Sequence, residues 1–348
     1  MVKNVDYLVV GLGIAGISVC EKLREQGKTF VAVDSGAKGA TATSGGVFNP
    51  TVLKRFTAAW NAASFFSVAV DFYRSLEKTL GIPFFIETSI LRIFSSVSEQ
   101  NNWSVASDKK LLNQYITAEF LKNPNPLIHA PLGFGKVLGT AQILTDKLLA
   151  GYREFLIKNN SLVAEHFEYG KLIQTETGVV YKDMAAKKVI FTEGAQVVNN
   201  PFFPKQCLIG NKGEYLIIKA PGLNLNQLLK GPLYVIPLGD EVYKVGATYK
   251  SADFSVHTTQ AAKKEMVVSL KTFINCPFEI IGQTAGVRPT TMDHRPLLGS
   301  LGEFPNLVFL NGLGSRGFLM APLLSKVIYD FVENGVPVPP EMALQRML

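Results

Sequence analysis

The sequence predicts a mixed α/β protein, with a parallel sheet in one part of the chain and an antiparallel sheet in another. Three observations support this prediction. Residues 7–34 read as strand, glycine turn, helix and strand, residues 213–250 alternate with turn residues between them, and residues 307–333 read as another strand, glycine turn and helix. The first and third patterns are typical of parallel α/β units, and the second is typical of an antiparallel sheet.

The N-terminal unit has the spacing of a dinucleotide-binding turn. An apolar run, 7–10, ends in Gly-x-Gly-x-x-Gly, a helix is expected over 14–26, and an acidic residue follows the apolar run 30–33. The glycines permit a sharp turn, a close approach of pyrophosphate and tight helix–sheet packing, and the helix N-terminus attracts phosphate. An ordinary βαβ unit with small residues for packing is the alternative. The residues expected to contact the dinucleotide here are Gly11, Gly13, Ile14, Ala15, Gly16, Asp34 and Ser35.

The composition allows a large buried core. The chain has 348 residues, 47% of them hydrophobic and 18% charged, which is enough for two domains. The formal net charge of +7 is spread without a long run of lysine or arginine. Such a field suits an anionic cofactor or a carboxylate substrate. It is compatible with nucleic acid as a partner, which nothing else in the sequence favours.

The cysteines and histidines argue against disulfides and metals. Cys20, Cys207 and Cys276 lie far apart, and the four histidines show no HxxH or HExxH spacing. We therefore expect no metal and a reducing compartment, the cytoplasm. No apolar run reaches the roughly 18–20 residues that span a bilayer. Charges return at Glu21 and Lys22, so neither a membrane span nor a secretory signal is expected.

The remaining pattern predicts where the other elements lie. Apolar residues spaced by three and four predict helices over 57–80, 141–158, 258–273 and about 319–333. Short strands are expected near 163–167, 171–175, 178–181, 189–195 and 307–310. Residues 82–135 read as strands and loops outside the nucleotide domain, and residues 213–250 predict a β-meander.

Two further glycine-rich segments are expected to face a ligand. Residues 35–50 are too polar for an ordinary helix and too apolar at their end for a free linker, so we expect backbone packed on a flat ligand, with a surface loop as the alternative. Residues 311–317 follow a buried strand and precede a helix with Pro322 in its first turn. That helix N-terminus can stabilise negative charge, as at the N1/O2 edge of a reduced flavin, and an ordinary capped helix is the alternative.

A third informative segment, residues 286–299, contains an arginine followed by two prolines that make the segment rigid. Arg288 precedes Pro289, and Pro296 follows seven residues later. A guanidinium held in this way can bind a carboxylate through two parallel hydrogen bonds. A structural arginine–carboxylate pair is the alternative.

These pieces together resemble the D-amino acid oxidase/glycine oxidase/sarcosine oxidase family of FAD-dependent oxidoreductases, nearly from end to end. The N-terminal glycine motif with Asp34 is similar to the ADP-binding unit of that family, and residues 44–50 are similar to its flavin-contacting loop. Residues 286–299 are similar to its arginine–proline run, and residues 311–322 to its C-terminal flavin turn.

The resemblance implies FAD as the cofactor and a particular domain organisation. It implies a Rossmann-like FAD-binding domain with a parallel sheet over 1–80, 140–205 and 285–348, and a smaller antiparallel-sheet substrate-binding domain over 81–139 and 206–284. Further FAD contacts are then expected at Ser44, Gly45, Gly46, Phe167, Gly194, Gly312, Gly314, Ser315, Arg316, Gly317, Phe318 and Leu319.

The resemblance also implies roles for single residues. Arg288 takes the position that binds the substrate carboxylate, and Tyr234 takes that of a tyrosine facing the substrate, although a tyrosine packed in a hairpin is an equally good interpretation. Two positions depart from the family pattern. Glu193 stands where a small residue is usual, and His294 stands where glycine is usual. The C-terminal turn has no cysteine, so covalent flavin attachment is not expected.

The predicted function is oxidation of a C–N bond in a small amine or amino acid, by hydride transfer to flavin N5 with oxygen as acceptor. One alternative is a flavin oxidase acting on a modified tRNA nucleoside or another large amine, because the glycine turns also resemble the oxidase half of the bacterial enzyme that matures wobble uridine. The other is a non-catalytic dinucleotide-binding protein, which Glu193 and the lack of an evident general base motivate. Substrate, acceptor and oligomeric state are not predicted.

Overall fold

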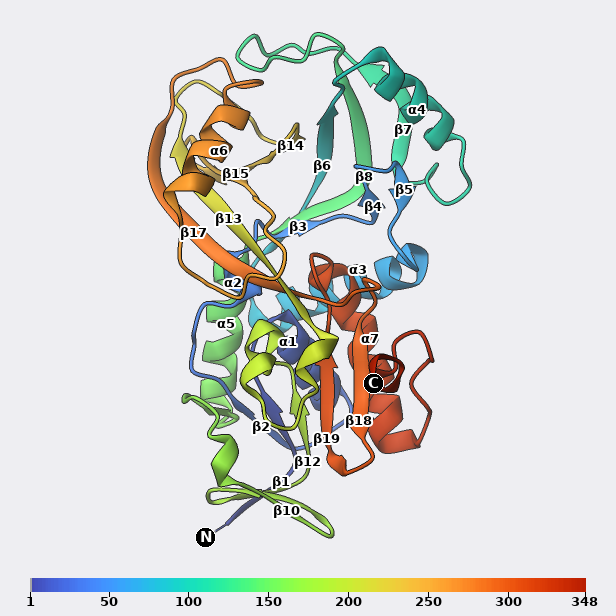
Figure 1. Ribbon diagram of the computed structural model, residues 1–348, viewed down its shortest axis with the longest axis vertical. Helices are drawn as coiled ribbons and strands as arrows, with labels where there is room; N and C mark the ends of the chain where they lie inside the picture. Colours follow the sequence, from blue (N-terminus) through green and yellow to red (C-terminus); the bar gives the residue numbers. More distant parts are fainter. Residues whose placement is uncertain (1) are drawn as a thin grey trace.

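The computed structural model describes residues 2–348 and contains two large β-sheets that follow one another along its longest axis (Figure 1). Sheet A occupies the lower half of this view, and sheet B occupies the upper half. The N-terminus lies at the lower end of sheet A. Among the described residues, no helix combines the length and apolar content that crossing a bilayer requires.

Sheet A has eight strands. Their order is β10 (Leu172–Thr175), β11 (Gly178–Tyr181), β12 (Met184–Phe191), β1 (Lys3–Val10), β2 (Phe30–Val33) and β9 (Leu162–Val163), with β19 (Phe304–Asn311) beside β12 and β18 (Leu297–Leu301) beside β19. The pairs β12–β1, β1–β2, β2–β9 and β12–β19 are parallel. Val10 pairs with Phe191 on one side and with Val33 on the other. The residues after these three strands therefore leave the sheet side by side, at the edge where α/β proteins bind ligands.

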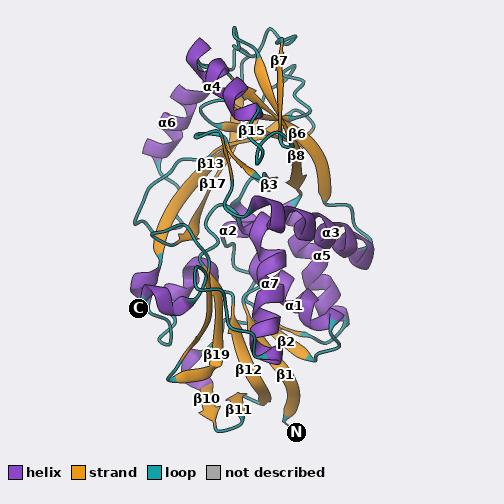
Figure 2. Ribbon diagram, turned by 90° about the vertical axis from the view of Figure 1, so that its right-hand side faces the viewer, coloured by secondary structure: helices purple, strands orange, loops and turns teal. Residues whose placement is uncertain are grey.

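Both faces of sheet A are covered. Side chains alternate between the two faces along each strand, so each face packs against a layer of its own. Tyr7 and Val9 pack against helices on one face, and Leu8 and Val10 pack in the layer on the other face. The helices are α1 (Ile14–Glu25), α3 (Ala62–Leu80), α5 (Thr145–Lys158) and α7 (Gly317–Asn334). Figure 2 shows them gathered on one side of the strands.

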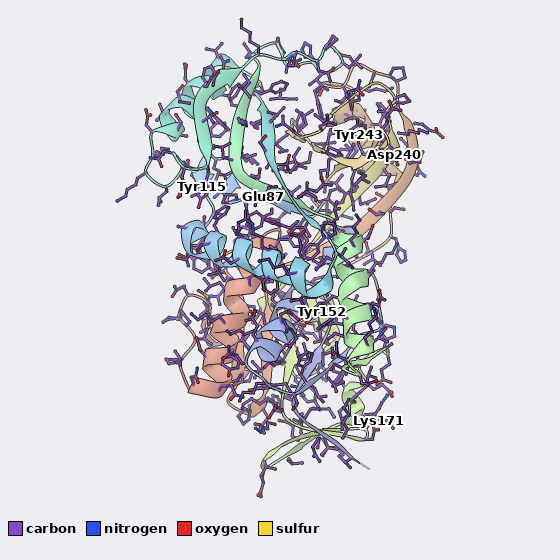
Figure 3. The ribbon with its side chains drawn as sticks, turned by 180° about the vertical axis from the view of Figure 1, so that it is seen from behind. Glu87, Tyr115, Tyr152, Lys171, Asp240 and Tyr243 are labelled. Carbon is purple, nitrogen blue, oxygen red and sulfur yellow. The ribbon has the colours of Figure 1, made fainter. Side chains whose placement is uncertain are left out.

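Sheet B has nine strands and is antiparallel except for one pair. Its order is β17 (Glu279–Thr290), β13 (Ile209–Lys219), β16 (Val242–Gly246), β15 (Tyr234–Gly239), β14 (Leu228–Lys230), β6 (Phe85–Ile93), β8 (Phe134–Ile143) and β3 (Val47–Phe48), with β7 (Ile116–Leu121) beside β8. Only β14 and β6 pair in parallel. Helix α6 (Gln260–Leu270) packs on one face over Leu216 and Ile218. Figure 3 labels Tyr243 and Asp240 in this upper unit and Tyr152 on α5 below it.

The predicted fold class is confirmed, and several element boundaries differ from the predictions. Helix α4 (Val97–Ser107) lies inside the segment expected to hold strands and loops, where its Trp103 is buried. Ser96 caps this helix by accepting the N–H of Glu99, a capping pair that the sequence displays. The strand β8 continues to residue 143, so α5 begins at 145 rather than 141. Residues 51–58 form a small hairpin of β4 (Thr51–Val52) and β5 (Thr57–Ala58), so α3 begins at 62 rather than 57.

The predicted domain boundaries fall within strands of sheet B. The strand β8 crosses the boundary at 139/140, and β17 crosses the boundary at 284/285. The short strand β3, assigned to the FAD-binding domain, pairs with β8 of sheet B. The division of the chain into two separable domains stays a prediction.

Candidate functional site

The N-terminal glycine turn is closed by close backbone contacts. Gly11 has a φ of +93°, and a Cβ added to it would lie 2.9 Å from the carbonyl oxygen of Thr192. A Cβ on Gly16 would lie 1.9 Å from the carbonyl oxygen of Gly11, so only glycine fits. The hydroxyl of Thr192 donates to the Gly11 carbonyl at 2.7 Å. The turn therefore directs the free N–H groups at the start of α1 out of the sheet edge, where a pyrophosphate can accept them.

The carboxylate of Asp34 lies beside this turn. It accepts the N–H groups of Leu12 at 2.9 Å and of Gly36 at 2.8 Å. Arg153 of α5 forms an ion pair with the same carboxylate. This arginine was not predicted, because it lies about 120 residues from Asp34 in the sequence. The sequence of its helix shows only that it belongs to a polar face. The carboxylate keeps lone-pair capacity for a ribose hydroxyl, since ionised carboxylates offer about four acceptor positions.

The loop over residues 39–46 lies between the helices of sheet A and sheet B. It contains the short helix α2 (Ala40–Thr43), whose Thr41 hydroxyl accepts the N–H of Ile14 at 3.0 Å. A Cβ on Gly46 would lie 2.0 Å from the carbonyl oxygen of Ile143, and one on Gly45 would lie 2.2 Å from Ile236. The carbonyl of Ser44 accepts the Lys244 ammonium at 2.8 Å. The predicted loop contacts, Ser44, Gly45 and Gly46, therefore lie where the two sheets meet.

The C-terminal glycine turn reaches the N-terminal one. A Cβ on Gly317 would lie 3.1 Å from Cγ2 of Ile14, so the first turns of α7 and α1 are in contact. The side-chain amide of Asn311 donates to the carbonyl of Gly194 at 2.9 Å and so ties this turn to the turn after β12. The hydroxyl of the buried Tyr73 donates to the Phe318 carbonyl at 2.7 Å. Two glycine turns about 300 residues apart thus form one edge, as the sequence predicts for a single extended ligand.

The side chain of Arg316 points away from this turn, toward sheet B. Its guanidinium donates to the carbonyl of Asn49 at 2.6 Å and to that of Thr51 at 2.7 Å. Burial lowers the pKa of Arg316 from its usual value. The predicted cofactor contact of Arg316 can therefore come only from its backbone in this structure. A small cavity beside it is lined by Val47, Asn49, Ser315, Arg316, Phe318 and Leu319.

One face of sheet B, which we call the inner face, meets the 39–46 loop. We define it by the residues that the register aligns on one side of the sheet: Arg92, Asn211, Tyr215, Lys230, Tyr234, Lys244, Thr284 and Arg288. Tyr215 and Tyr234 flank Gly246 in one row, and a Cβ on Gly246 would lie 2.5 Å from the Tyr215 ring. The Lys244 ammonium lies 5.1 Å from the centre of that ring. Burial raises the pKa of Tyr234 and lowers that of Lys244.

Arg288 lies on the inner face opposite Asn211. Its guanidinium covers Gly213, where a Cβ would lie 2.4 Å from Nη2. Within residues 2–348, five buried side-chain atoms have no hydrogen-bond partner, namely Ser18 Oγ, Arg92 Nε, Asn211 Oδ1, Thr284 Oγ1 and Arg288 Nη1. Four of these five belong to the inner face. Because buried polar groups are normally paired, this concentration marks a place where a polar ligand completes the hydrogen bonding.

The remaining predicted positions lie on the other side of the N-terminal turn. Phe167 stacks on Tyr181, with ring centres 4.3 Å apart, and it contributes its side chain to the core rather than to the edge of the sheet. Glu193 accepts hydrogen bonds from Tyr169 at 2.5 Å and from Asn200 at 2.9 Å. Thr41, Arg153, Asn211 and Tyr215 were missed by the sequence reasoning. Tyr215 had a signal, because it lies in the alternating segment 213–250 on the same face as Tyr234.

The fold and the site together define a class of protein. A glycine turn in which Gly11 and Gly16 leave no room for a side chain, an acidic residue beside it and a second helix N-terminus in contact with the first fit the two ends of one FAD molecule. The protein is therefore an FAD-dependent oxidoreductase.

The family follows from comparison with known proteins. The family model DAO, FAD dependent oxidoreductase, matches residues 6–331, and the chain belongs to this family. It is 24% identical to glycine oxidase of Bacillus subtilis over 361 residues, which cover 96% of this chain and 94% of the relative. It is also 24% identical to the tRNA 5-methylaminomethyl-2-thiouridine biosynthesis bifunctional protein MnmC of Idiomarina loihiensis, over 93% of this chain but only 55% of the relative.

A solved structure agrees with the fold. Glycine oxidase from Geobacillus kaustophilus superposes with a TM-score of 0.78 over 98% of both chains, at 17% sequence identity. The relatives are oxidoreductases, so the interpretation as a non-catalytic dinucleotide-binding protein receives no support from them.

Proposed function

We propose that the enzyme oxidises the C–N bond of a small amine or amino acid that carries a carboxylate, with oxygen as the final acceptor. The observation that carries this proposal is the buried, unpaired nitrogen of the Arg288 guanidinium. The guanidinium lies flat over Gly213, and its Nη1 atom is buried without a partner. A carboxylate would give this atom an acceptor, and arginine binds carboxylates in a planar, two-bond arrangement.

The inner face suggests how the rest of such a substrate would be held. Tyr234 and Tyr215 flank Gly246, and the Tyr215 ring occupies the space that a side chain at Gly246 would take. We assign these tyrosines to the walls of the substrate pocket and Arg288 to its anchor. FAD, when bound, supplies the acceptor for the hydride that leaves the carbon next to nitrogen. The protein contributes orientation and exclusion of water.

Among the residues of the inner face defined above, none is a carboxylate or a histidine that could serve as a general base. The carboxylate of Glu99 on α4 contacts this face, but it is held in an ion pair with Arg92. A substrate amine must therefore be neutral before oxidation, because a protonated nitrogen has no lone pair to stabilise the developing positive charge. The cationic surroundings favour that form, since Lys244 and Arg288 repel an ammonium group.

The direct test is reduction of the bound flavin in the absence of oxygen. A panel should contain glycine, N-methylglycine, larger amino acids, the matching amines without a carboxylate, and 2-hydroxy acids. We expect bleaching of the flavin absorbance by at least one amine with a carboxylate, and peroxide on re-admission of air. Bleaching only by hydroxy acids would contradict the proposal.

The substitution Arg288→Lys tests the anchor within the same assay. Lysine keeps the charge but loses the planar pair of donors, so we expect KM for the carboxylate substrate to rise roughly 10- to 100-fold, the equivalent of about 1.5–3 kcal/mol. Amines without a carboxylate should be unaffected. An unchanged KM would remove Arg288 from the site.

A large amine, such as a modified tRNA nucleoside, is the second candidate. It is favoured by the match of 93% of this chain to MnmC, a bifunctional protein of tRNA 5-methylaminomethyl-2-thiouridine biosynthesis. The same anaerobic assay separates the two candidates when a nucleoside with a carboxymethylaminomethyl group is added to the panel.

We also place the protein in the cytoplasm, because its three widely spaced cysteines fit a reducing compartment.

A further inference from the structure

Glu193, which stands where a small residue is usual in the family, is the middle residue of the tripeptide 192–194. This tripeptide contacts three parts of the candidate FAD site. The hydroxyl of Thr192 donates to the carbonyl of Gly11 in the N-terminal turn. The carbonyl of Gly194 accepts the amide of Asn311 beside the C-terminal turn. Glu193, between them, binds Tyr169. Each residue of the tripeptide thus holds a different segment, and the middle residue holds the one that follows β9.

The segment held by Glu193 leaves sheet A at its ligand-binding edge. It leaves β9 at Val163, whose carbonyl accepts the N–H of Asp34 at 3.1 Å. It ends at Tyr169, whose ring packs near Phe191 at the end of β12, with centres 6.4 Å apart. Strands β2 and β1 lie between β9 and β12, so the segment passes over the face of sheet A where Phe167 and Tyr169 pack against the core.

Glu193 is enclosed and fully hydrogen bonded. Its Oε1 accepts from Tyr169 at 2.5 Å, and its Oε2 accepts from Asn200 at 2.9 Å. Asn200 is fully buried, and its side-chain carbonyl oxygen accepts the N–H of Phe202, so its side-chain nitrogen is the atom that faces Glu193. Asn200 therefore requires an acceptor at this position, whereas the Tyr169 hydroxyl can donate to an ionised carboxylate or accept from a protonated carboxyl.

We propose that Glu193 is a positioning residue for FAD, which fastens the 164–169 segment beside the N-terminal glycine turn and couples cofactor affinity to its own protonation. This inference concerns cofactor binding and does not depend on which substrate the enzyme oxidises. An alanine or other small residue at this position could not make the connection to Tyr169.

The direction of the coupling follows from charge and burial. Burial raises the pKa of Glu193 from 4.5 to about 7. The ionisable group that faces it is Tyr169, whose own pKa is raised well above its usual value, and no lysine, arginine or histidine of residues 2–348 contributes to the shift of Glu193. A doubly negative pyrophosphate beside Gly11 disfavours the ionised carboxylate further. FAD binding should therefore favour the protonated form and, by reciprocity, protonation should favour FAD.

The test measures the dissociation constant of FAD between pH 6 and pH 8.5, from flavin fluorescence during serial dilution of the holoenzyme. For the wild type we expect the dissociation constant to rise roughly tenfold with pH, the effect of a one-unit difference in pKa between free and loaded protein. Glu193→Gln is neutral at every pH. Its oxygen can accept from Asn200 and its amide can donate to the Tyr169 hydroxyl, so its dissociation constant should be flat and close to the low-pH value of the wild type.

Two further variants distinguish positioning from a merely structural role. Glu193→Ala loses the contact with Tyr169 and should bind FAD at least tenfold more weakly than Glu193→Gln at pH 6. Glu333→Gln is the matched control, because Glu333, at the C-terminal end of α7, also accepts a tyrosine hydroxyl, that of Tyr7, but forms an ion pair with Lys28. It should leave both the affinity and its pH profile unchanged.

Two results would overturn the inference. A wild-type pH profile that Glu193→Gln reproduces would remove the coupling to this carboxyl. Equal FAD affinity of Glu193→Ala and Glu193→Gln would remove its positioning role. Because every readout is the release of flavin, failure here would leave the proposal of C–N oxidation untouched.

Discussion

At the scale of single residues, Gly213 supports the substrate anchor without touching a substrate. It lies under the Arg288 guanidinium, in the space that any side chain would take. Nothing in the sequence around Gly213 indicates this role, because the two residues are 75 positions apart and meet only through the antiparallel pairing of β13 with β17. The orientation of Arg288 therefore depends on a neighbour that carries no functional group.

We predict that Gly213→Ala reproduces much of the effect of Arg288→Lys. A Cβ 2.4 Å from Nη2 must push the guanidinium away, so KM for the carboxylate substrate should rise roughly tenfold or more, with a smaller effect on FAD affinity. Steady-state kinetics on the substrate found by flavin bleaching measures this change.

The control for this variant is Gly282→Ala on the facing strand. Its Cβ would lie 3.5 Å from Ile217, an ordinary contact, so KM should not change. A second check is the double variant with Arg288→Lys. Because both changes act on one guanidinium, their effects should not add, and full additivity would contradict the proposed link.

At the scale of elements, the first turn of α7 is held to the segment that follows β3 by one buried arginine. Arg316 spans from this turn to the carbonyl of Asn49 and to that of Thr51, the first residue of β4. Among the described residues its side chain has no carboxylate partner, so its contribution lies in satisfying two buried acceptors rather than in a salt bridge. The position of the C-terminal turn relative to the 39–46 loop depends on these two bonds.

We predict that Arg316→Met destabilises the FAD-free protein by roughly 2–4 kcal/mol, because two carbonyls lose their donors. Denaturant unfolding measures the loss. The comparison variant is Arg74→Met, which breaks an ion pair between side chains that are 56% and 58% exposed and should cost less than about 1 kcal/mol. Equal losses for the two variants would show that the Arg316 bonds do not hold the turn.

The elements that sequence could predict are those with strong local signals. Both glycine turns and their flanking strands and helices were predicted within a few residues, because apolar runs, glycine spacing and Pro322 act locally. Helix α4 was missed because its apolar residues do not form a stripe, although its capping pair is visible. The partners of Asp34 and Arg288 could not be predicted, because Arg153 and Gly213 reach them only through tertiary packing and strand register.

At the scale of the whole molecule, the candidate site lies between the two sheets. The N-terminal turn and Asp34 belong to sheet A, whereas Tyr215, Lys244 and Arg288 belong to sheet B. The 39–46 loop contacts both, through Thr41 to the start of α1 and through Ser44 to Lys244. A ligand that fills this junction should stabilise both halves of the molecule together.

We predict that FAD at about 100 times its dissociation constant raises the free energy of unfolding by about 2.7 kcal/mol, and Tm by about 4 °C for a chain of 348 residues. The two tryptophans report on different halves. Trp60 packs against the helices beside sheet A, and Trp103 is buried in the cluster on the inner face of sheet B that contains Ile236. Single-tryptophan variants, Trp60→Phe and Trp103→Phe, should therefore show the same FAD-induced shift in their melting curves.

FMN serves as the control ligand because it lacks the adenosine half that Asp34 and the 164–169 segment are placed to receive. It should give a clearly smaller shift in both variants at the same concentration. A shift seen by Trp60 alone would mean that FAD stabilises sheet A without engaging sheet B. The inner face would then lie apart from the flavin, and Arg288 could not anchor a substrate for it.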